Sequence, residues 1–583
     1  MNADLLLSHF DRISEAPDAV SRLRGFILDL AVRGKLIEQD AKDKPALTLL
    51  GKIRAQKGLL GIPAEAEFIP VDERPFDIPP NWIWLRLGDL CSKTGSGSTP
   101  RGGKAVYQRD GVPFLRSQNV HNDGLRLDDV AYITSETHEK MSGTALQPGD
   151  LLLNITGGSI GRCCIVPAGI GPANVSQHVA IIRIAIDGMA RYLHPLVLSP
   201  YFQSFVLSEQ TGAGRGGLPK NRMDRIPVAL PPLAEQNRIV AKVDELMALC
   251  DQLDRAQHTR ESRRTELGAS ALHRVNNGSN VEEIREYGRF YLSHLHDVSF
   301  QPEQLPLLRQ TILSLAVRGN LVPQTPGDEP AVELLKRIQI EKTRCVKEGS
   351  LRKEKPLAEI PEEQKPFVLP GSWSWARIGA CARGTEYGTS VKSDQIEDGV
   401  PVLAMGDIQD GRVILNTRKK VQRQIEDLPR LFLQRSDLLY NRTNSAELVG
   451  KTGIYLGDDD AYTFASYLIR LRFFSEFVSP VYVNIAMNAP YFRKTQIIPQ
   501  LRQQCGQANV NGSKLRNMII PLPPIAEQQR IVAKVEQLIT LCDQMEVRLL
   551  ATQEERHALL GAVLYHSLND SHHEIDTNFA VKA

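Results

Sequence analysis

The sequence predicts an α+β fold in which two pseudo-symmetric α/β domains are separated by a pair of long antiparallel helices with coiled-coil character. The motif Leu-Pro-Pro-x-Ala-Glu-Gln-x-Arg-Ile-Val occurs at residues 230–240 and again at 522–532, which indicates an internal duplication. A heptad pattern of apolar residues follows each copy. Short β-type runs and glycine-rich turns precede each copy, so each half joins a mixed domain to a helix.

Length and composition favour a soluble protein of several domains. The chain has 583 residues, with 42% hydrophobic and 24% charged residues, which is ordinary for globular proteins. The formal net charge is only +2, so any surface that attracts nucleic acid must be local.

The location that the sequence predicts is the cytoplasm. The eight cysteines show neither a CxxC pair nor zinc spacing, which favours reduced thiols. No apolar run approaches the roughly 18 residues that a membrane span needs. The first 30 residues lack the apolar core of a signal peptide.

The duplication can be followed along the whole chain. An amphipathic helix pattern, an acidic and proline-rich connector and a Trp-x-Trp pair occur in both halves, with the pairs at Trp82 and Trp373. We expect five segments: an N-terminal helical region at 1–80, a first mixed domain at 81–231, a central helical and spacer region at 232–372, a second mixed domain at 373–523, and a C-terminal spacer helix with a tail at 524–583.

The two mixed domains share several short motifs, but the sequences between these motifs differ. Asp150-Leu-Leu matches Asp437-Leu-Leu, and Asn154 matches Asn441, whereas the intervening sequences diverge. Two equivalent scaffolds with different surfaces are the simplest explanation.

The long helices begin after the Pro-Pro pairs, since proline suits the first turn of a helix. Their apolar residues alternate at steps of four and three, which is a heptad seam of roughly 30 Å. We expect the two seams to pack on each other around a pseudo-twofold axis. The seam residues are Ile239, Val243, Leu246, Cys250 and Leu253 in the first helix and Ile531, Val535, Leu538, Cys542 and Met545 in the second.

Catalytic motifs are weak in this sequence. The Gly-Lys-Thr at residues 450–452 lacks the first glycine of a phosphate loop, because Ser445 stands there, so an ordinary turn is favoured. Asp458–Asp460 fits a solvated acidic loop better than a cation site. We therefore expect no catalytic residue and no metal ligand in this chain.

Basic and amide residues gather in glycine-rich turns of both mixed domains. Arginine can read guanine and amides can read adenine, while lysine and arginine contact phosphates. Solvated loops explain each residue taken alone, but repetition at equivalent places favours DNA. The candidate DNA-binding residues are Lys93, Thr99, Arg101, Lys104, Arg116, Gln118, Asn119, Arg215, Lys220, Asn221 and Arg222 in the first domain and Lys392, Arg412, Arg418, Lys419, Arg442, Arg502, Gln503, Asn511 and Lys514 in the second.

These motifs together resemble the specificity subunit of type I restriction-modification systems over most of the chain. The resemblance rests on both Leu-Pro-Pro helix starts and on three segments of the first mixed domain: Gly-Ser-Thr99-Pro100-Arg101, Gly111-Val-Pro-Phe-Leu-Arg116, and Gly149-Asp-Leu-Leu-Leu-Asn154-Ile-Thr156 with Gly161-Arg162. The second mixed domain departs from this pattern, because Gly384-Thr-Glu-Tyr-Gly388 replaces the threonine-proline turn.

The resemblance implies a non-catalytic subunit with two target-recognition domains, each reading one half of a bipartite, asymmetric site in double-stranded DNA. It also implies two modification subunits that bind S-adenosylmethionine and methylate adenine, and restriction subunits that use ATP and magnesium. The chain itself would hold no cofactor and would contact no membrane. The helices would set the spacing of the half-sites and dock the modification subunits.

Two other classes remain open at this stage. A coiled-coil adaptor without sequence-specific DNA binding explains the helices but not two elaborate, divergent domains. A self-sufficient methyltransferase or nuclease would need a cofactor-binding glycine loop and an Asn/Asp-Pro-Pro-aromatic motif, which the sequence lacks.

Overall fold

The computed structural model describes residue 16 and residues 18–63, 66–102, 106–210, 216–277, 281–293, 304–445, 447–504 and 507–569. The chain divides into two compact units. Unit 1 comprises Met1–Thr259 and Thr552–Ala583, and unit 2 comprises Arg260–Ala551.

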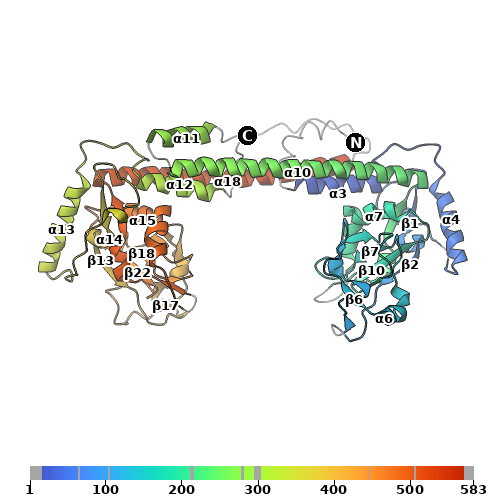
Figure 1. The fold of residues 1–583 in the computed structure, drawn as a ribbon, viewed down its shortest axis with the longest axis horizontal. Coiled ribbons are helices and arrows are strands. Elements are labelled where there is room, and N and C mark those ends of the chain that lie inside the picture. The colour runs from blue at the N-terminus through green and yellow to red at the C-terminus, as the bar shows by residue number, and fades with distance from the viewer. Residues whose placement is uncertain are drawn as a thin grey trace. The chain divides into compact units, whose positions relative to one another are not determined.

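The mixed domain of unit 1 is built on a sheet with the strand order β2-β10-β7-β8 (Figure 1). Its central strand β7 has the sequence Leu-Leu-Leu-Asn and is buried along its length, as expected of a strand covered on both faces. The strands of this sheet are β2 (Cys91–Ser96), β7 (Leu151–Asn154), β8 (Cys163–Ile165) and β10 (Val179–Ile184).

Smaller sheets complete this domain, with the orders β6-β3-β9, β4-β5 and β1-β11. Strands β1 and β11 pair antiparallel, so the chain enters and leaves the domain side by side. The strands are β1 (Ile83–Arg86), β3 (Val112–Leu115), β4 (Val120–His121), β5 (Gly124–Leu125), β6 (Ala131–Ile133), β9 (Asn174–Val175) and β11 (Pro227–Leu230). The short helices are α5 (Leu87–Leu90), α6 (Ser135–Lys140) and α9 (Lys220–Asp224).

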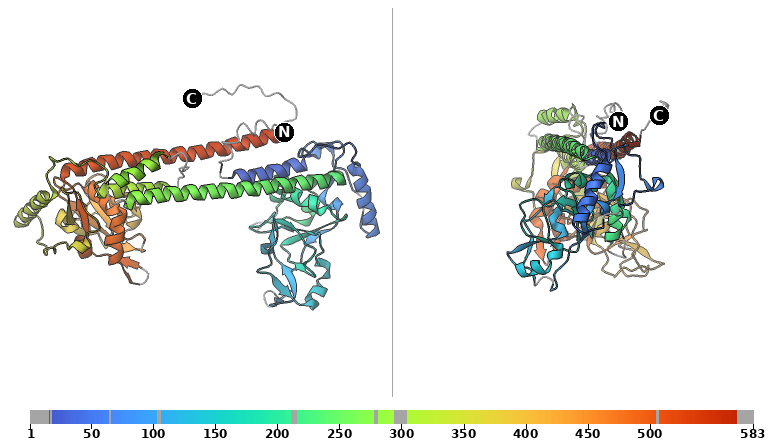
Figure 2. Two further views of the ribbon diagram at one scale, coloured as in Figure 1. Left: turned by 45° about the horizontal axis from the view of Figure 1, so that its top comes forward. Right: turned by 90° about the vertical axis from the view of Figure 1, so that its right-hand side faces the viewer.

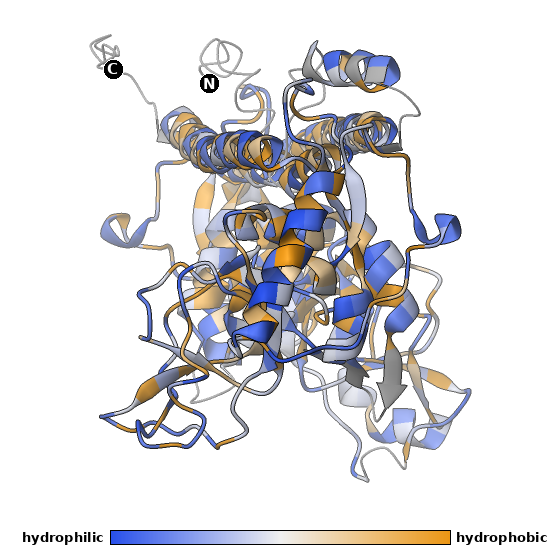
Figure 3. Cartoon of the chain, turned by 90° about the vertical axis from the view of Figure 1, so that its left-hand side faces the viewer, coloured by the Kyte–Doolittle hydropathy of each residue, from blue (hydrophilic) through white to orange (hydrophobic). Residues whose placement is uncertain are grey.

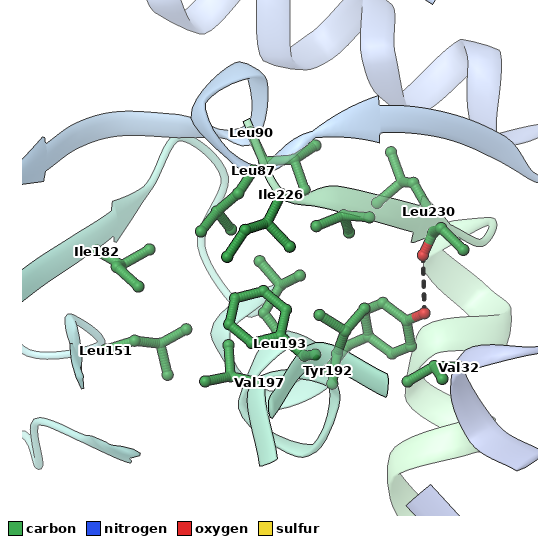
Figure 4. Close-up of a cluster of buried hydrophobic side chains, with 14 of the residues drawn as sticks. Val32, Leu87, Leu90, Leu151, Ile182, Tyr192, Leu193, Val197, Ile226 and Leu230 are labelled. Atoms are coloured by element: carbon green, nitrogen blue, oxygen red, sulfur yellow. Dashed lines mark hydrogen bonds between the residues drawn. The ribbon is translucent and has the colours of Figure 1, made fainter. Parts of the chain in front are cut away.

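Helices α7 (Ala190–Leu198) and α8 (Pro200–Ser208) close the core against the sheet. Leu193 and Val197 of α7 are buried in one cluster with Leu151 and Ile182 of the sheet (Figure 4). The hydroxyl of Tyr192 donates a hydrogen bond of 2.9 Å to the carbonyl of Ala229, so the buried phenol is satisfied (Figure 4).

The helical part of unit 1 is organised around α3 (Ala19–Val32). One side of α3 packs in the core that contains Ile239 and Val243 of α10 (Leu233–Asn277), and α3 runs beside the first part of α10 (Figures 1 and 2). Its Phe26 and Leu30 pack instead on Leu560 and Leu564, near the end of α18 (Ile525–Asn569). The amphipathic helix α4 (Ala46–Leu59) buries Leu50 and Ile53.

The mixed domain of unit 2 repeats this plan on a sheet with the order β13-β22-β18-β20-β16-β15. Strand β18 is equivalent to β7 and is likewise buried along its length. The strands are β13 (Ala382–Tyr387), β15 (Ile408–Gln409), β16 (Arg412–Val413), β18 (Leu438–Asn441), β20 (Thr452–Ile454) and β22 (Leu468–Phe473).

The smaller sheets of unit 2 have the orders β12-β25, β17-β14-β21 and β19-β24-β23. Their strands are β12 (Ser374–Arg377), β14 (Val400–Leu403), β17 (Lys420–Val421), β19 (Thr443–Asn444), β21 (Thr463–Phe464), β23 (Arg502–Gln504), β24 (Gln507–Asn509) and β25 (Ile519–Leu522). The helices of this domain are α14 (Ile378–Cys381), α15 (Pro480–Asn488), α16 (Pro490–Phe492) and α17 (Gly512–Asn517).

Helix α12 (Leu305–Val317) plays the part of α3 in unit 2. Its Ile312 is buried in one core with Ile531 of α18, and Arg309 donates hydrogen bonds of 2.7 Å to both Asp543 and Glu546. Another side of α12 meets the last turns of α10, where Asn276 donates a 2.9 Å hydrogen bond to Thr311. Helix α11 (Val281–Ser293) also contributes to this second contact.

Helix α13 (Ala331–Lys347) repeats α4 and lies at the near side of unit 2 in Figure 3, where hydrophilic and hydrophobic residues alternate along it. Lys342 of α13 donates a 2.6 Å hydrogen bond to the carbonyl of Gly379 at the base of the mixed domain. Lys57 of α4 reaches the equivalent carbonyl of Gly88 at 3.5 Å. A lysine of each helix thus holds it to the base of its mixed domain.

The expected α+β class is confirmed, but the expected packing of the two seams on each other is wrong. The seams lie in separate cores. Ile239, Val243 and Cys250 are buried in unit 1, with Leu246 and Leu253 partly buried beside them. Ile531, Val535 and Cys542 are buried in unit 2, with Leu538 and Met545 partly buried beside them. The reason is that α3 and α12 carry apolar stripes of their own, which cover each seam within its own unit.

None of the helices in the described ranges combines the length and the apolar character that a bilayer span requires.

Candidate nucleic-acid interface

Several loops of the mixed domain in unit 1 meet at one edge, where β2, β3 and β7 end. Backbone hydrogen bonds join them: Ser98 N to Val175 O at 3.0 Å, Ser176 N to Leu115 O at 2.8 Å, Ile155 N to His178 O at 3.0 Å, and Leu218 N to Ile155 O at 2.9 Å. We call this surface the first loop edge. It comprises residues 97–101, 115–119, 155–162, 175–178 and 216–222.

Unit 2 repeats the same backbone connections. Thr389 N donates to Phe464 O at 2.9 Å, Ala465 N to Leu403 O at 2.9 Å, Arg442 N to Tyr467 O at 3.1 Å, and Val510 N to Arg442 O at 2.9 Å. The second loop edge comprises residues 388–392, 403–407, 442–445, 447–451, 464–467 and 509–514. Two surfaces with one backbone frame therefore carry different side chains.

Glycine is required at one matching place in each frame. A Cβ on Gly97 would lie 2.0 Å from the carbonyl oxygen of Val175, and a Cβ on Gly388 would lie 2.2 Å from that of Phe464. Gly388 thus occupies the place of Gly97, although no proline follows it. The replacement of the threonine-proline turn in the second mixed domain thus changes the side chains of this turn but keeps the close approach of the two backbone segments.

The candidates Arg116 and Gln118 lie on the first loop edge. Arg116 donates to the carbonyl of Asp129 at 3.0 Å, and Gln118 donates to the carboxylate of Asp129 at 2.6 Å. Thr99 is half-buried and Arg101 is exposed on the neighbouring turn. These contacts are on the surface, so DNA could displace them at small cost.

The prediction that Asn119 reads a base is wrong, because its side chain is only 2% exposed. Its Oδ1 accepts a 2.9 Å hydrogen bond from the backbone N–H of Arg116, and its Nδ2 donates to the carbonyl of Arg126 at 2.8 Å. The amide therefore holds the turn that presents Arg116 and Gln118. An asparagine that closes its own turn cannot be distinguished by residue type from one that reads adenine.

Of the other described candidates of unit 1, three lie in helix α9, and Lys93 lies in β2. Lys220 lies about 4.0 Å from the place of a Cβ on Gly95 and pairs with Asp224, Arg222 pairs with Glu209, and Asn221 is exposed. Lys93 donates to the carbonyl of Gly143, and burial lowers its pKa. Lys93 is thus engaged within the domain. The candidates Lys104 and Arg215 lie outside the described residues.

In unit 2, Arg442 lies over the ring of Tyr387, 5.0 Å from its centre, and donates to the carbonyl of Ser466 at 2.9 Å. Lys514 donates to the carbonyl of Gln500 at 2.6 Å, and Lys392 is exposed beside Asp394. These residues belong to the second loop edge.

The other candidates of unit 2 have different positions. Asn511 caps α17, since its side chain accepts a 2.9 Å hydrogen bond from Lys514 N. Arg412, Arg418 and Lys419 are exposed on β16 and on the segment that leads to β17. Arg502 and Gln503 lie in β23, and their side chains are outside the described residues.

Sequence reasoning missed one pair of cations, Arg162 and Lys451. Each is exposed and follows a glycine in a turn of its loop edge. The signal was available, because both follow the matched asparagines Asn154 and Asn441 in a Gly-Arg or Gly-Lys pair.

The described cysteines are free and buried. Burial raises the pKa of the Cys164 and Cys381 thiols to about 12, so both stay protonated at neutral pH. Among the residues that the structure describes, no group of three or more His, Cys, Asp or Glu side chains is placed to hold a metal ion.

The chain belongs to the family of type I restriction modification DNA specificity domains, whose pattern matches residues 79–260 and 388–552. It is 30% identical over 577 residues to the type I restriction enzyme EcoEI specificity subunit of Escherichia coli, covering 94% of each chain. The EcoAI specificity subunit of Escherichia coli is also 30% identical, over 583 residues and 94% of each chain. The resemblance inferred from the sequence is thereby confirmed.

A solved structure of the HsdS subunit from Thermoanaerobacter tengcongensis is also similar, with 18% identity and a TM-score of 0.40. That comparison covers 85% of this chain and 99% of the other.

Proposed function

We propose that this chain is the DNA specificity subunit of a type I restriction-modification complex, in which each mixed domain reads one half of a bipartite, asymmetric site. The observation that carries the proposal is the pair of loop edges. Their backbone hydrogen bonds match one for one, whereas their side chains differ. A shared frame with different polar groups is what two half-sites of different sequence require.

Affinity and identity come from different residues in this proposal. Exposed lysine and arginine side chains contact phosphates and position each domain, and a few polar side chains reach base edges. The two edges differ where Arg116 and Gln118 of unit 1 correspond to Ala404 and Gly406 of unit 2. The two half-sites should therefore differ in sequence.

The helices supply the partner surfaces. Lys242 and Leu249 of α10 recur as Lys534 and Leu541 of α18, and the two leucines are 52% and 47% exposed. An apolar residue that is exposed twice at one place favours two copies of one partner. We assign this partner as the modification subunit, which binds S-adenosylmethionine. The restriction subunits would bring ATP and magnesium, and the chain itself would catalyse no reaction in the cytoplasm.

The helices would also set the half-site spacing. An insertion of about four residues in both helices would add roughly 6 Å, close to two base-pair steps. The same bipartite sequence with a longer spacer is the expected result.

The function is tested by producing the chain together with its modification subunit and mapping methylated adenines over a genome. We expect one bipartite motif with two different halves. The variant Gln118→Ala should change only the half read by unit 1, and the wild-type second half is the internal control. A chain that assembles with its partner but does not retain duplex DNA would instead be a coiled-coil adaptor.

A further inference from the structure

Arg162 and Lys451 stand at the same place in the two mixed domains. Asn154 N donates to Arg162 O at 2.8 Å, and Gly161 N donates back to Asn154 O at 2.8 Å. In unit 2, Asn441 N donates to Lys451 O at 2.9 Å, and Gly450 N donates to Asn441 O at 2.8 Å. Each cation therefore closes a loop on the end of a central strand, β7 or β18.

Both loops end in the same turn. Arg162 N donates to Ser159 O at 3.2 Å around Gly161, whose φ is +88°. Lys451 N donates to Leu448 O at 3.3 Å around Gly450, whose φ is +94°. Positive φ at the third residue defines a type II turn and requires glycine.

The turns are fastened to the body of each domain. Gln203 of α8 donates a 2.9 Å hydrogen bond to the carbonyl of Gly161, and Arg493 donates a 3.0 Å bond to the carbonyl of Val449. Asn154 is fully buried and donates at 2.8 Å to the carbonyl of Ser117 on the first loop edge. The backbone of each turn is therefore held in place before any ligand arrives.

The two cations are nevertheless free to bind. Both residues are exposed, and neither side chain forms a hydrogen bond or an ion pair within the described part of the chain. Most other cations of the loop edges are engaged, such as Lys220 with Asp224 and Lys514 with the carbonyl of Gln500. A fixed backbone thus presents an unpaired positive charge twice.

We propose that Arg162 and Lys451 each contact a DNA phosphate and fasten their domain to the backbone without reading sequence; this inference rests on the proposed function. The duplication keeps the charge but not the shape of the side chain, because lysine lacks the planar fork of arginine. A phosphate contact needs charge, whereas bidentate reading of guanine needs the fork. Two domains that read different bases still face the same phosphate chemistry.

The test uses the full chain bound to its modification subunits and a labelled duplex that carries the mapped site. Binding is measured over a series of salt concentrations for the wild type, Arg162→Gln, Lys451→Gln, Arg162→Lys and Lys451→Arg. Lys336→Gln on α13 is the control for the loss of one positive charge, because Lys336 is an exposed lysine of the helical region, where it pairs with Glu333. Thermal unfolding of each variant verifies its fold.

We expect each glutamine variant to bind more weakly and to lower the slope of log affinity against log salt by about 1. The exchanges Arg162→Lys and Lys451→Arg should keep the slope, and the methylated motif should stay unchanged in all variants. Unchanged slopes in folded glutamine variants would overturn this inference alone. An altered motif would do so as well, because it would make the residue a base reader. A wild-type complex that does not bind the duplex would instead overturn the proposed function and this inference with it.

Discussion

The indole Nε1 of Trp82 donates a 2.9 Å hydrogen bond to the Oε2 atom of Glu235, and Trp373 repeats this contact with Glu527 at 3.0 Å. In each unit a glutamine donates to the other carboxylate oxygen at 2.7 Å. Both glutamates are 1% exposed. The near-identical Leu-Pro-Pro motif therefore locks the start of each long helix onto the base of its own mixed domain, and its glutamate is not available to a partner.

Removing this acceptor should destabilise the unit that contains it. Glu235→Ala leaves the buried indole N–H of Trp82 without a partner, which costs about 1–3 kcal/mol. Glu235→Gln keeps an acceptor oxygen and should cost less. Urea unfolding, monitored by circular dichroism, measures the difference in stability between the two variants. Glu527→Ala tests the same contact in unit 2. Equal midpoints for the alanine and glutamine variants would contradict the role of the hydrogen bond.

The same carboxyl groups should make stability depend on pH. Burial raises the pKa of Glu235 and Glu527 above the ordinary value of 4.5. A carboxyl with a higher pKa in the folded protein binds its proton more tightly there than in the unfolded chain. Its contribution to the free energy of unfolding is therefore complete below pH 4.5 and is lost as the pH rises through the raised pKa. Glu235→Gln cannot ionise.

The stability of Glu235→Gln relative to the wild type should therefore increase as the pH rises from about 4.5 toward neutrality. Paired unfolding curves at each pH give this difference directly. A difference that is flat, or that falls with rising pH, would count against the raised pKa.

An ion pair between a buried aspartate and a partly exposed arginine occupies matching positions in the two mixed domains. Arg183 donates to both carboxylate oxygens of Asp150 at 2.7 and 2.8 Å, and Arg472 does the same with Asp437 at 2.7 and 2.9 Å. Since Asp150 is buried, Arg183→Leu should cost about 3–5 kcal/mol by leaving its charge unpaired. Adding Asp150→Asn should recover part of the loss in denaturant unfolding. The prediction fails if the single and the double variant are equally unstable.

Gly161 should not tolerate a side chain. An added Cβ would meet the Oε1 atom of Gln203 at 2.1 Å, and the positive φ adds strain, so Gly161→Ala should cost more than about 1 kcal/mol. Gly158 lies in the same loop with open space around it. Gly158→Ala is thus the matched control and should be nearly neutral in thermal unfolding. Similar losses in both variants would show that the turn geometry is not the cause.

The duplication made much of the fold predictable. The spacing of the repeated Trp-x-Trp pair and Leu-Pro-Pro motif brackets each mixed domain, and the structure pairs β1 with β11 and β12 with β25 at these positions. The buried strands β7 and β18 are also readable as apolar runs that end in Asn154 and Asn441. Repetition supplied information that a single copy lacks, because it separates residues that the frame needs from residues that differ.

The seam partners and the side-chain roles were not predictable in the same way. A heptad pattern shows that Ile239 and Val243 pack against another helix, but it does not show whether that helix is the other long helix or a short one such as α3. Asn119 has an amide that could pair with adenine, but that amide already forms hydrogen bonds within its own turn. Arg162 was part of a motif that carries the family resemblance but not a candidate for DNA contact, and only its match with Lys451 makes it one.

Unit 1 is made of residues from both ends of the chain, which has a consequence for biosynthesis. Residues 260–551 are contiguous, so unit 2 has all its parts on the ribosome before the last turns of α18 emerge. The face of α3 that holds Phe26 and Leu30 stays uncovered until Leu560 and Leu564 arrive. The unit begun first is thus completed last, and it exposes apolar surface for most of translation. A premature stop within α18 would spare the sequence of both mixed domains and still leave unit 1 unfinished.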